Sequence, residues 1–152
     1  MPNIDLKLLV EEILTASREL VLATCAGNVP WASTLVFGHD ADFNLYWISD
    51  EKTRHSRELV KNPQVSAAMT VPSSKNKGLQ IQGEARELKE EEVVGAAREY
   101  FAKRGTTKLP ETLGDVNDLT KGRAWYVLKP TKIYVLDEEL FGFDRQEYTP
   151  ET

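Results

Sequence analysis

Short runs of apolar and β-branched residues, each bounded by turn-forming residues, recur along most of this chain. The runs cover residues 20–24, 31–37, 44–48, 65–71, 79–88 and 124–137. Ala26-Gly27-Asn28 separates the first two runs and is typical of a hairpin turn. The last run contains Pro130, so it forms either a final strand pair or one bent strand. About six strands in short meanders predict a mainly β protein built as a small closed barrel.

Helical patterns occupy the segments between some of these runs. Apolar residues at a spacing of three and four predict an amphipathic helix over residues 5–19. Residues 89–104 carry acidic side chains in the first turn and basic ones in the last, which complements a helix dipole. A shorter helix is expected within 109–120. The chain of 152 residues contains no linker or repeat, so we expect one domain over residues 1–152 with helices flanking the barrel.

Charge and composition exclude several classes of protein. The formal net charge is -5 and no block of basic residues occurs, which argues against a nucleic-acid partner. Charged residues interrupt the N-terminal apolar segment, and no run approaches the roughly 20 apolar residues of a membrane span. Cys25 is the only cysteine, so an internal disulfide is impossible. A cytoplasmic protein without a membrane partner is expected.

Motifs for several common chemistries are missing from the sequence. There is no Gly-rich phosphate loop, no dinucleotide fingerprint and no nucleophile elbow. His39 and His55 are the only histidines and lack the spacing of a metal-binding helix, so no metal site is expected. The acidic clusters at 90–92 and 137–139 are typical of solvated surfaces. No catalytic acid or base can be assigned.

The segment SDEKTRHSRELVKNP, residues 49–63, is the strongest candidate for a binding site. It follows a buried strand and opens a short helix with Thr53 and Arg54. A helix N-terminus offers unpaired N–H groups and positive partial charge, which suit a phosphate, and Arg54 can add a charge-assisted pair. Ser49 and Thr53 add hydroxyl donors. An ordinary polar helix start capped by Asp50 or Thr53 explains the local pattern equally well.

Helical spacing within this segment separates an inward face from an outward one. It places Ser56, Leu59 and Val60 inward, and it leaves Arg57, Glu58 and Lys61 facing solvent.

The order of these segments resembles the FMN-binding split-barrel superfamily typified by pyridoxamine 5'-phosphate oxidase. The similarity is carried by LVLATCAGNVPWASTLVF, LYWISDEKTRHSRELVKNPQVSAAM and IQGEARELKEEE, with weaker agreement in AWYVLKPTKIYVLD. EKTRHS and LFGFD look closest to a small bacterial branch of that superfamily. The resemblance implies a six-stranded antiparallel split β-barrel.

The resemblance also implies positions for the cofactor. In the oxidases, a hydroxyl residue that ends the third strand and the residues that open the next helix hold the flavin phosphate; they correspond to Ser49, Thr53, Arg54 and His55. The main chain of the second strand runs beside the flavin ring, which corresponds to Ser33, Thr34, Leu35 and Val36.

This chain departs from the oxidases at three charged positions. Ser33 and Gly38 stand where the oxidases have a strand arginine and a closing lysine, and His55 replaces a helix lysine. The substrate-binding C-terminal segment of the oxidases is not recognisable after Pro130, so pyridoxamine phosphate is not assigned as the substrate.

By this resemblance, the chain is expected to be a homodimeric flavoprotein that passes a hydride between NAD(P)H and a small acceptor. FMN carries the chemistry of such a protein. A non-catalytic flavin, deazaflavin or haem binding or sensing protein is the main alternative. A cofactor-free dimer is the third.

Overall fold

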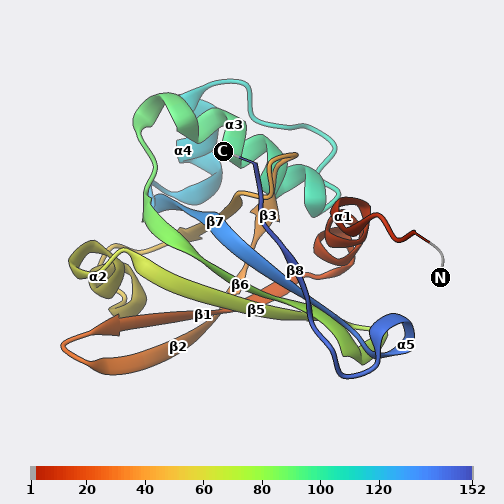
Figure 1. Ribbon diagram of the computed structural model, residues 1–152. Helices are drawn as coiled ribbons and strands as arrows, with labels where there is room; N and C mark the ends of the chain where they lie inside the picture. Colours follow the sequence, from red (N-terminus) through yellow and green to blue (C-terminus); the bar gives the residue numbers. More distant parts are fainter. Residues whose placement is uncertain (1–2, 152) are drawn as a thin grey trace.

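The computed structural model describes residues 3–151, which form an antiparallel sheet curled around an apolar core (Figure 1). The sheet order is β2-β1-β5-β6-β7-β4-β3, and β8 pairs with β7. The strands are β1 Glu19–Ala26, β2 Val29–Val36, β3 Gly38–His39, β4 Leu45–Ser49, β5 Gln64–Val71, β6 Ser74–Glu87, β7 Ala124–Asp137 and β8 Gln146–Tyr148. The six longer strands confirm the expected antiparallel split barrel. The short β3 and β8 bring the sheet to eight strands.

Five helices surround this sheet in the described residues: α1 Leu6–Ala16, α2 Arg54–Lys61, α3 Glu90–Lys103, α4 Leu113–Thr120 and α5 Glu138–Phe141. Figure 1 shows α3 and α4 together at one end of the sheet and α2 beside the β1–β2 hairpin. The first helix ends before the expected residue 19, because Ser17 is extended and both its N–H and its hydroxyl donate to Ile13 O. None of these helices is long and apolar enough to cross a membrane.

Strand β7 is one continuous strand, which decides between the strand pair and the bent strand. Its register against β6 shifts where Gln82 pairs with Lys132 and Gly83 pairs with Pro130. The extra residue, Thr131, forms a bulge in which its hydroxyl donates to Gln82 O at 3.1 Å. A bulge tolerates a proline that cannot donate to the ladder.

The alternation of β7 divides the apolar interior into two clusters. Tyr126 and Leu128 face the main core, which the sheet forms with α1 and α2. Trp125 and Val127 face a second cluster under α3 and α4. Because successive side chains of a strand point to opposite faces, one strand anchors both layers. This arrangement fixes α3 against the sheet.

Strand β2 lies at the edge of the sheet and is poorly covered. Val29 is 54% exposed, Trp31 42% and Val36 44%. The strand pairs with β1 along its whole length, from Glu19 opposite Val36 to Ala26 opposite Val29. A long, apolar and unpaired edge is available for a further protein surface.

Candidate functional site

The first turn of α2 is organised by Thr53. Its hydroxyl oxygen accepts from Ser56 N at 3.3 Å, and its O–H donates to Asp50 O at 2.9 Å. Thr53, rather than Asp50, is therefore the N-cap. The first helical bond runs from Arg57 N to Thr53 O at 3.0 Å, so the N–H groups of Arg54 and His55 precede the intrahelical ladder.

His55 connects this turn to the end of β4. Its Nε2 lies 2.8 Å from the hydroxyl of Ser49 and 3.3 Å from that of Thr53. The side chain is buried, and burial lowers the pKa of His55 below its usual value. His55 is therefore neutral at neutral pH, and it positions two hydroxyl groups without adding the positive charge of a lysine.

We expect His55 to make the stability of the fold depend on pH. Its folded-state pKa is lowered, so the unfolded chain binds more protons as the pH falls below about 6.5. Its contribution is complete above the unfolded pKa and is lost as the pH falls towards the folded one. Urea unfolding at pH 7.5 and 5.5 should show a larger loss of unfolding free energy at the lower pH for the wild type than for His55→Gln. Equal losses of unfolding free energy in both proteins would contradict it.

The side chain of Arg54 packs against Trp31 of the β1–β2 hairpin. Its Nε donates to Glu58 Oε2 at 2.8 Å, and its guanidinium carbon is 4.1 Å from the centre of the Trp31 ring. The hydroxyl of Thr24 donates to Glu58 Oε1 at 2.7 Å, and Thr24 pairs directly with Trp31 across the hairpin. Hydrogen bonds from Arg54 and then from Thr24 lower the pKa of Glu58. The salt bridge uses Nε, and the remaining N–H donors of Arg54 are on its two Nη atoms.

The faces of α2 differ in part from those expected. Ser56 and Leu59 are buried and Arg57 is exposed, as the helical spacing indicates. The expected positions of Glu58 and Val60 were wrong, because Glu58 is only 9% exposed and Val60 is 74% exposed. The carboxylate of Glu58 accepts hydrogen bonds from Arg54 and from Thr24 of β1, which accounts for its burial.

The four β2 residues expected beside the flavin ring divide between two faces of the strand. Ser33 and Leu35 lie on the face of Leu20 and Leu22, their partners in β1, and Leu35 packs against the main core. Thr34 and Val36 face the other way and line separate cavities of about 510 and 750 Å³. The structure therefore brings together the side chains of Ser49, Thr53 and His55, but it distributes those of β2.

The cavity beside Val36 is rich in positive charge. Arg18, Lys103 and Arg104 line it, and Glu19 is the one acidic residue among the described lining residues. Arg104 is fixed by a 2.7 Å hydrogen bond to Tyr100 O and stacks 3.5 Å from the centre of the Tyr100 ring. Burial lowers the pKa of Arg104, and the neighbouring charge of Arg18 adds to the effect. From the sequence, the basic end of α3 was predictable only as a complement to the helix dipole, and its approach to Arg18 depends on the fold.

The residues that the structure describes do not form a metal site. In residues 3–151, no group of three or more His, Cys, Asp or Glu side chains is placed to hold a metal ion. Cys25 is a free, partly buried thiol.

Three solved structures share this fold at low sequence identity. General Stress Protein 26 of Bacillus anthracis is 18% identical, with a TM-score of 0.69 over 96% of this chain and 99% of that one. A protein of Listeria innocua provisionally named a pyridoxamine 5'-phosphate oxidase is 22% identical, with a TM-score of 0.67 over 88% of this chain and 99% of that one. A heme binding protein of Mycobacterium smegmatis is 16% identical, with a TM-score of 0.74 over 98% of this chain and 60% of that one.

No curated protein sequence matches this chain significantly. A family model, in contrast, matches most of the sequence. The family model described as pyridoxamine 5'-phosphate oxidase matches residues 7–137, which include every strand from β1 to β7. The chain therefore belongs to the pyridoxamine 5'-phosphate oxidase-like family of split-barrel proteins.

Proposed function

We propose that this protein binds FMN as a homodimer and passes a hydride between a nicotinamide nucleotide and a small acceptor. The observation that carries the proposal is the first turn of α2, where the hydroxyl groups of Ser49 and Thr53 and unpaired N–H groups gather at one helix N-terminus, with Arg54 in the same turn. Membership of the pyridoxamine 5'-phosphate oxidase-like family supports it.

The donor set at α2 fits the phosphate of FMN. Ser49 and Thr53 supply hydroxyl groups, and the N–H groups of Arg54 and His55 lie at the positive end of the helix. The Nη atoms of Arg54 can form charge-assisted hydrogen bonds with phosphate oxygens. Glu58 neutralises part of this charge, and neutral His55 adds none. We therefore expect modest rather than very tight binding.

The edge strand supports both a flavin ring and a second protomer. We assign the main chain of Ser33, Thr34, Leu35 and Val36 to the isoalloxazine. The exposed side chains of Val29, Trp31 and Val36 need a cover in water, and a second copy of the chain supplies one. A groove between two copies would place the ring between protein surfaces.

The acceptor is proposed to be an anion. The cavity that Val36 shares with Arg18 and Arg104 lies at the end of the strand assigned to the ring. A carboxylate or phosphate group on the acceptor would offset the mutual repulsion of these cations. When bound, FMN supplies the hydride chemistry, and the protein contributes orientation and charge.

Haem binding is a second candidate, because the Mycobacterium smegmatis heme binding protein shares the fold. His39 and His55 are the available imidazoles. Each is already bonded, His39 to Glu11 at 3.1 Å and His55 to Ser49 at 2.8 Å, so ligation would replace a hydrogen bond. A deazaflavin binder, a flavin sensor and a cofactor-free dimer are further outcomes of the test below.

The ultraviolet-visible spectrum of the purified protein, recorded before and after addition of FMN, separates these functions. We expect flavin bands, and we expect anaerobic NADH or NADPH to bleach them without an added partner protein. A Soret band would favour haem, and an unbleached flavin would favour a binding protein. Light scattering on the same sample should give twice the chain mass of 17.2 kDa, and a single species at 17.2 kDa would contradict the dimer.

A further inference from the structure

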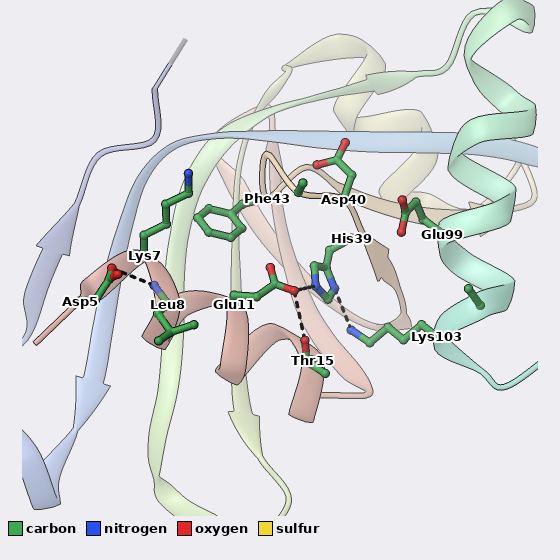
Figure 2. A pocket seen from close by; sticks show the side chains of 12 residues that line it. Asp5, Lys7, Leu8, Glu11, Thr15, His39, Asp40, Phe43, Glu99 and Lys103 are labelled. Carbon is green, nitrogen blue, oxygen red and sulfur yellow. Dashed lines mark hydrogen bonds and ion pairs between the residues drawn. The ribbon is translucent and has the colours of Figure 1, made fainter.

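A cavity of about 690 Å³ lies between α1, the β3–β4 turn and the C-terminal half of α3. Figure 2 shows Glu11 and Thr15 reaching into it from α1, His39 from β3 and Lys103 from α3. None of the residues assigned to FMN lines this cavity. The cavity is therefore separate from the proposed FMN site, although Lys103 also lines the cavity proposed for the acceptor.

Three of these side chains form one continuous chain of polar contacts. Glu11 Oε1 lies 3.1 Å from His39 Nε2, and His39 Nδ1 lies 3.5 Å from Lys103 Nζ. The hydroxyl of Thr15 donates to the same Glu11 oxygen at 3.3 Å. With Nε2–H donating to the carboxylate, Nδ1 carries a lone pair that faces Lys103. Lys103, His39 and Glu11 therefore follow one another as an amine, a base and a carboxylate that orients the base.

The amine of Lys103 is held in place by α1 and by Phe37, the residue that follows β2. Nζ donates to Leu14 O at 2.8 Å and lies 3.5 Å from the centre of the Phe37 ring. Burial, followed by the adjacent charge of Arg104, lowers the pKa of Lys103 to about 8, although Glu11 opposes the shift. Desolvation beside another cation is a recognised way to make a lysine nucleophilic.

The other charged groups around the cavity are occupied or lie at its rim. Asp40 accepts hydrogen bonds from Asn44 N at 3.0 Å and from the hydroxyl of Tyr46 at 2.6 Å. Asp5 caps α1 by accepting from Leu8 N at 3.1 Å. In Figure 2, Lys7 and Glu99 point from α1 and α3 on either side of the central group. Glu11 is the carboxylate bonded to His39.

We propose that Lys103 is the nucleophile of a second site, where it forms an imine with a small aldehyde or ketone and His39, oriented by Glu11, transfers the protons. The neutral amine attacks the carbonyl carbon and the C–N bond forms. His39 Nδ1 accepts the first proton that nitrogen loses and returns it to the carbonyl oxygen, which gives a carbinolamine. The second amine proton follows the same route, the hydroxyl leaves as water and the C=N bond forms. No oxidant or reductant is consumed.

Reductive labelling of the whole protein with glycolaldehyde and cyanoborohydride tests this site, because cyanoborohydride delivers a hydride to the C=N bond and leaves a stable secondary amine. Peptide mass mapping gives the rate at each lysine. Lys61, which is exposed on α2, is the internal control. At pH 8 an amine with a pKa near 8 is neutral roughly 100-fold more often than an ordinary lysine. Allowing for access, we expect Lys103 to be labelled at least about 10-fold faster than Lys61.

Two variants complete the experiment. His39→Gln should slow labelling at Lys103 about 10-fold or more and leave Lys61 unchanged, because positioned proton transfer contributes at least that much. Lys103→Arg should remove the fast label. Wild-type labelling at Lys103 no faster than at Lys61 would overturn the proposal, and this measurement needs no variant to fold. An unchanged rate in folded His39→Gln would also overturn it.

Discussion

Replacing Arg54 by alanine is expected to weaken FMN binding on the order of 10- to 100-fold. A hydrogen bond to a charged group contributes roughly 1.5 to 3 kcal/mol, and about 1.4 kcal/mol corresponds to a factor of ten in affinity. Arg54 is the one guanidinium in the first turn of α2, where the phosphate would lie. Flavin fluorescence titration of the wild type and Arg54→Ala measures the change.

Arg57→Ala is the matched control for this measurement. It removes the same charge from the same helix, but Arg57 is exposed. A surface substitution of this kind usually changes stability by less than about 0.5 kcal/mol. Equal affinities of Arg54→Ala and Arg57→Ala for FMN would mean that the phosphate site is misplaced.

Arg54→Ala also breaks the salt bridge to Glu58 and leaves this poorly exposed carboxylate with the hydroxyl of Thr24 as its hydrogen-bond donor. The fold should therefore be weakened as well. Adding Glu58→Gln to Arg54→Ala removes that charge, so the double variant should regain thermal stability but not FMN affinity. Glu58→Gln alone releases the guanidinium and should bind FMN at least as well as the wild type.

The elements with long periodic patterns were predictable from sequence. The six longer strands are apolar or β-branched runs of five or more residues, and the first helix repeats its apolar spacing, so these patterns are recognisable in one sequence. Strands β3 and β8, of two and three residues, are too short to show a period. Their position depends on the neighbours that they pair with, β4 and β7.

Side-chain partners in the candidate sites were less predictable. The N-cap at Thr53 depends on neighbouring residues only, so it could be predicted from the sequence. The burial of Glu58 depends on Thr24, which is 34 residues away, and the packing of Arg54 depends on Trp31. Helical spacing alone therefore assigned Glu58 to solvent. Contacts between distant segments are determined by the fold, and one sequence does not specify them.

The same limit applies to the contacts of Lys103. Its neighbour His39 lies 64 positions earlier in the chain. The sequence showed only a basic helix end, which is common. Two cavities that meet at this residue become visible only when α3 is placed against α1 and β3.

Gly38 of β3 lies so close to α3 that the structure leaves no room for a side chain. A Cβ atom at this position would lie 2.6 Å from Tyr100 Cα and 2.9 Å from Tyr100 N. Both are backbone atoms of α3, so they cannot move without shifting the helix. The backbone of α3 therefore occupies the space that any side chain at position 38 would need.

Gly38→Ala is expected to lower the free energy of unfolding by about 2 to 3 kcal/mol, the upper part of the range for overpacking a well-filled interior. Gly95→Ala is the opposite control, because Gly95 lies in α3, the helix that Gly38 contacts, and nothing lies within 4 Å of a Cβ atom there. Alanine in an exposed helix interior should raise the unfolding free energy by about 0.5 to 1 kcal/mol. Urea unfolding of both variants at one pH gives the two signs directly. A stable Gly38→Ala would show that α3 can move away from β3, and the packing that holds Lys103 beside His39 would then be looser than the contacts indicate.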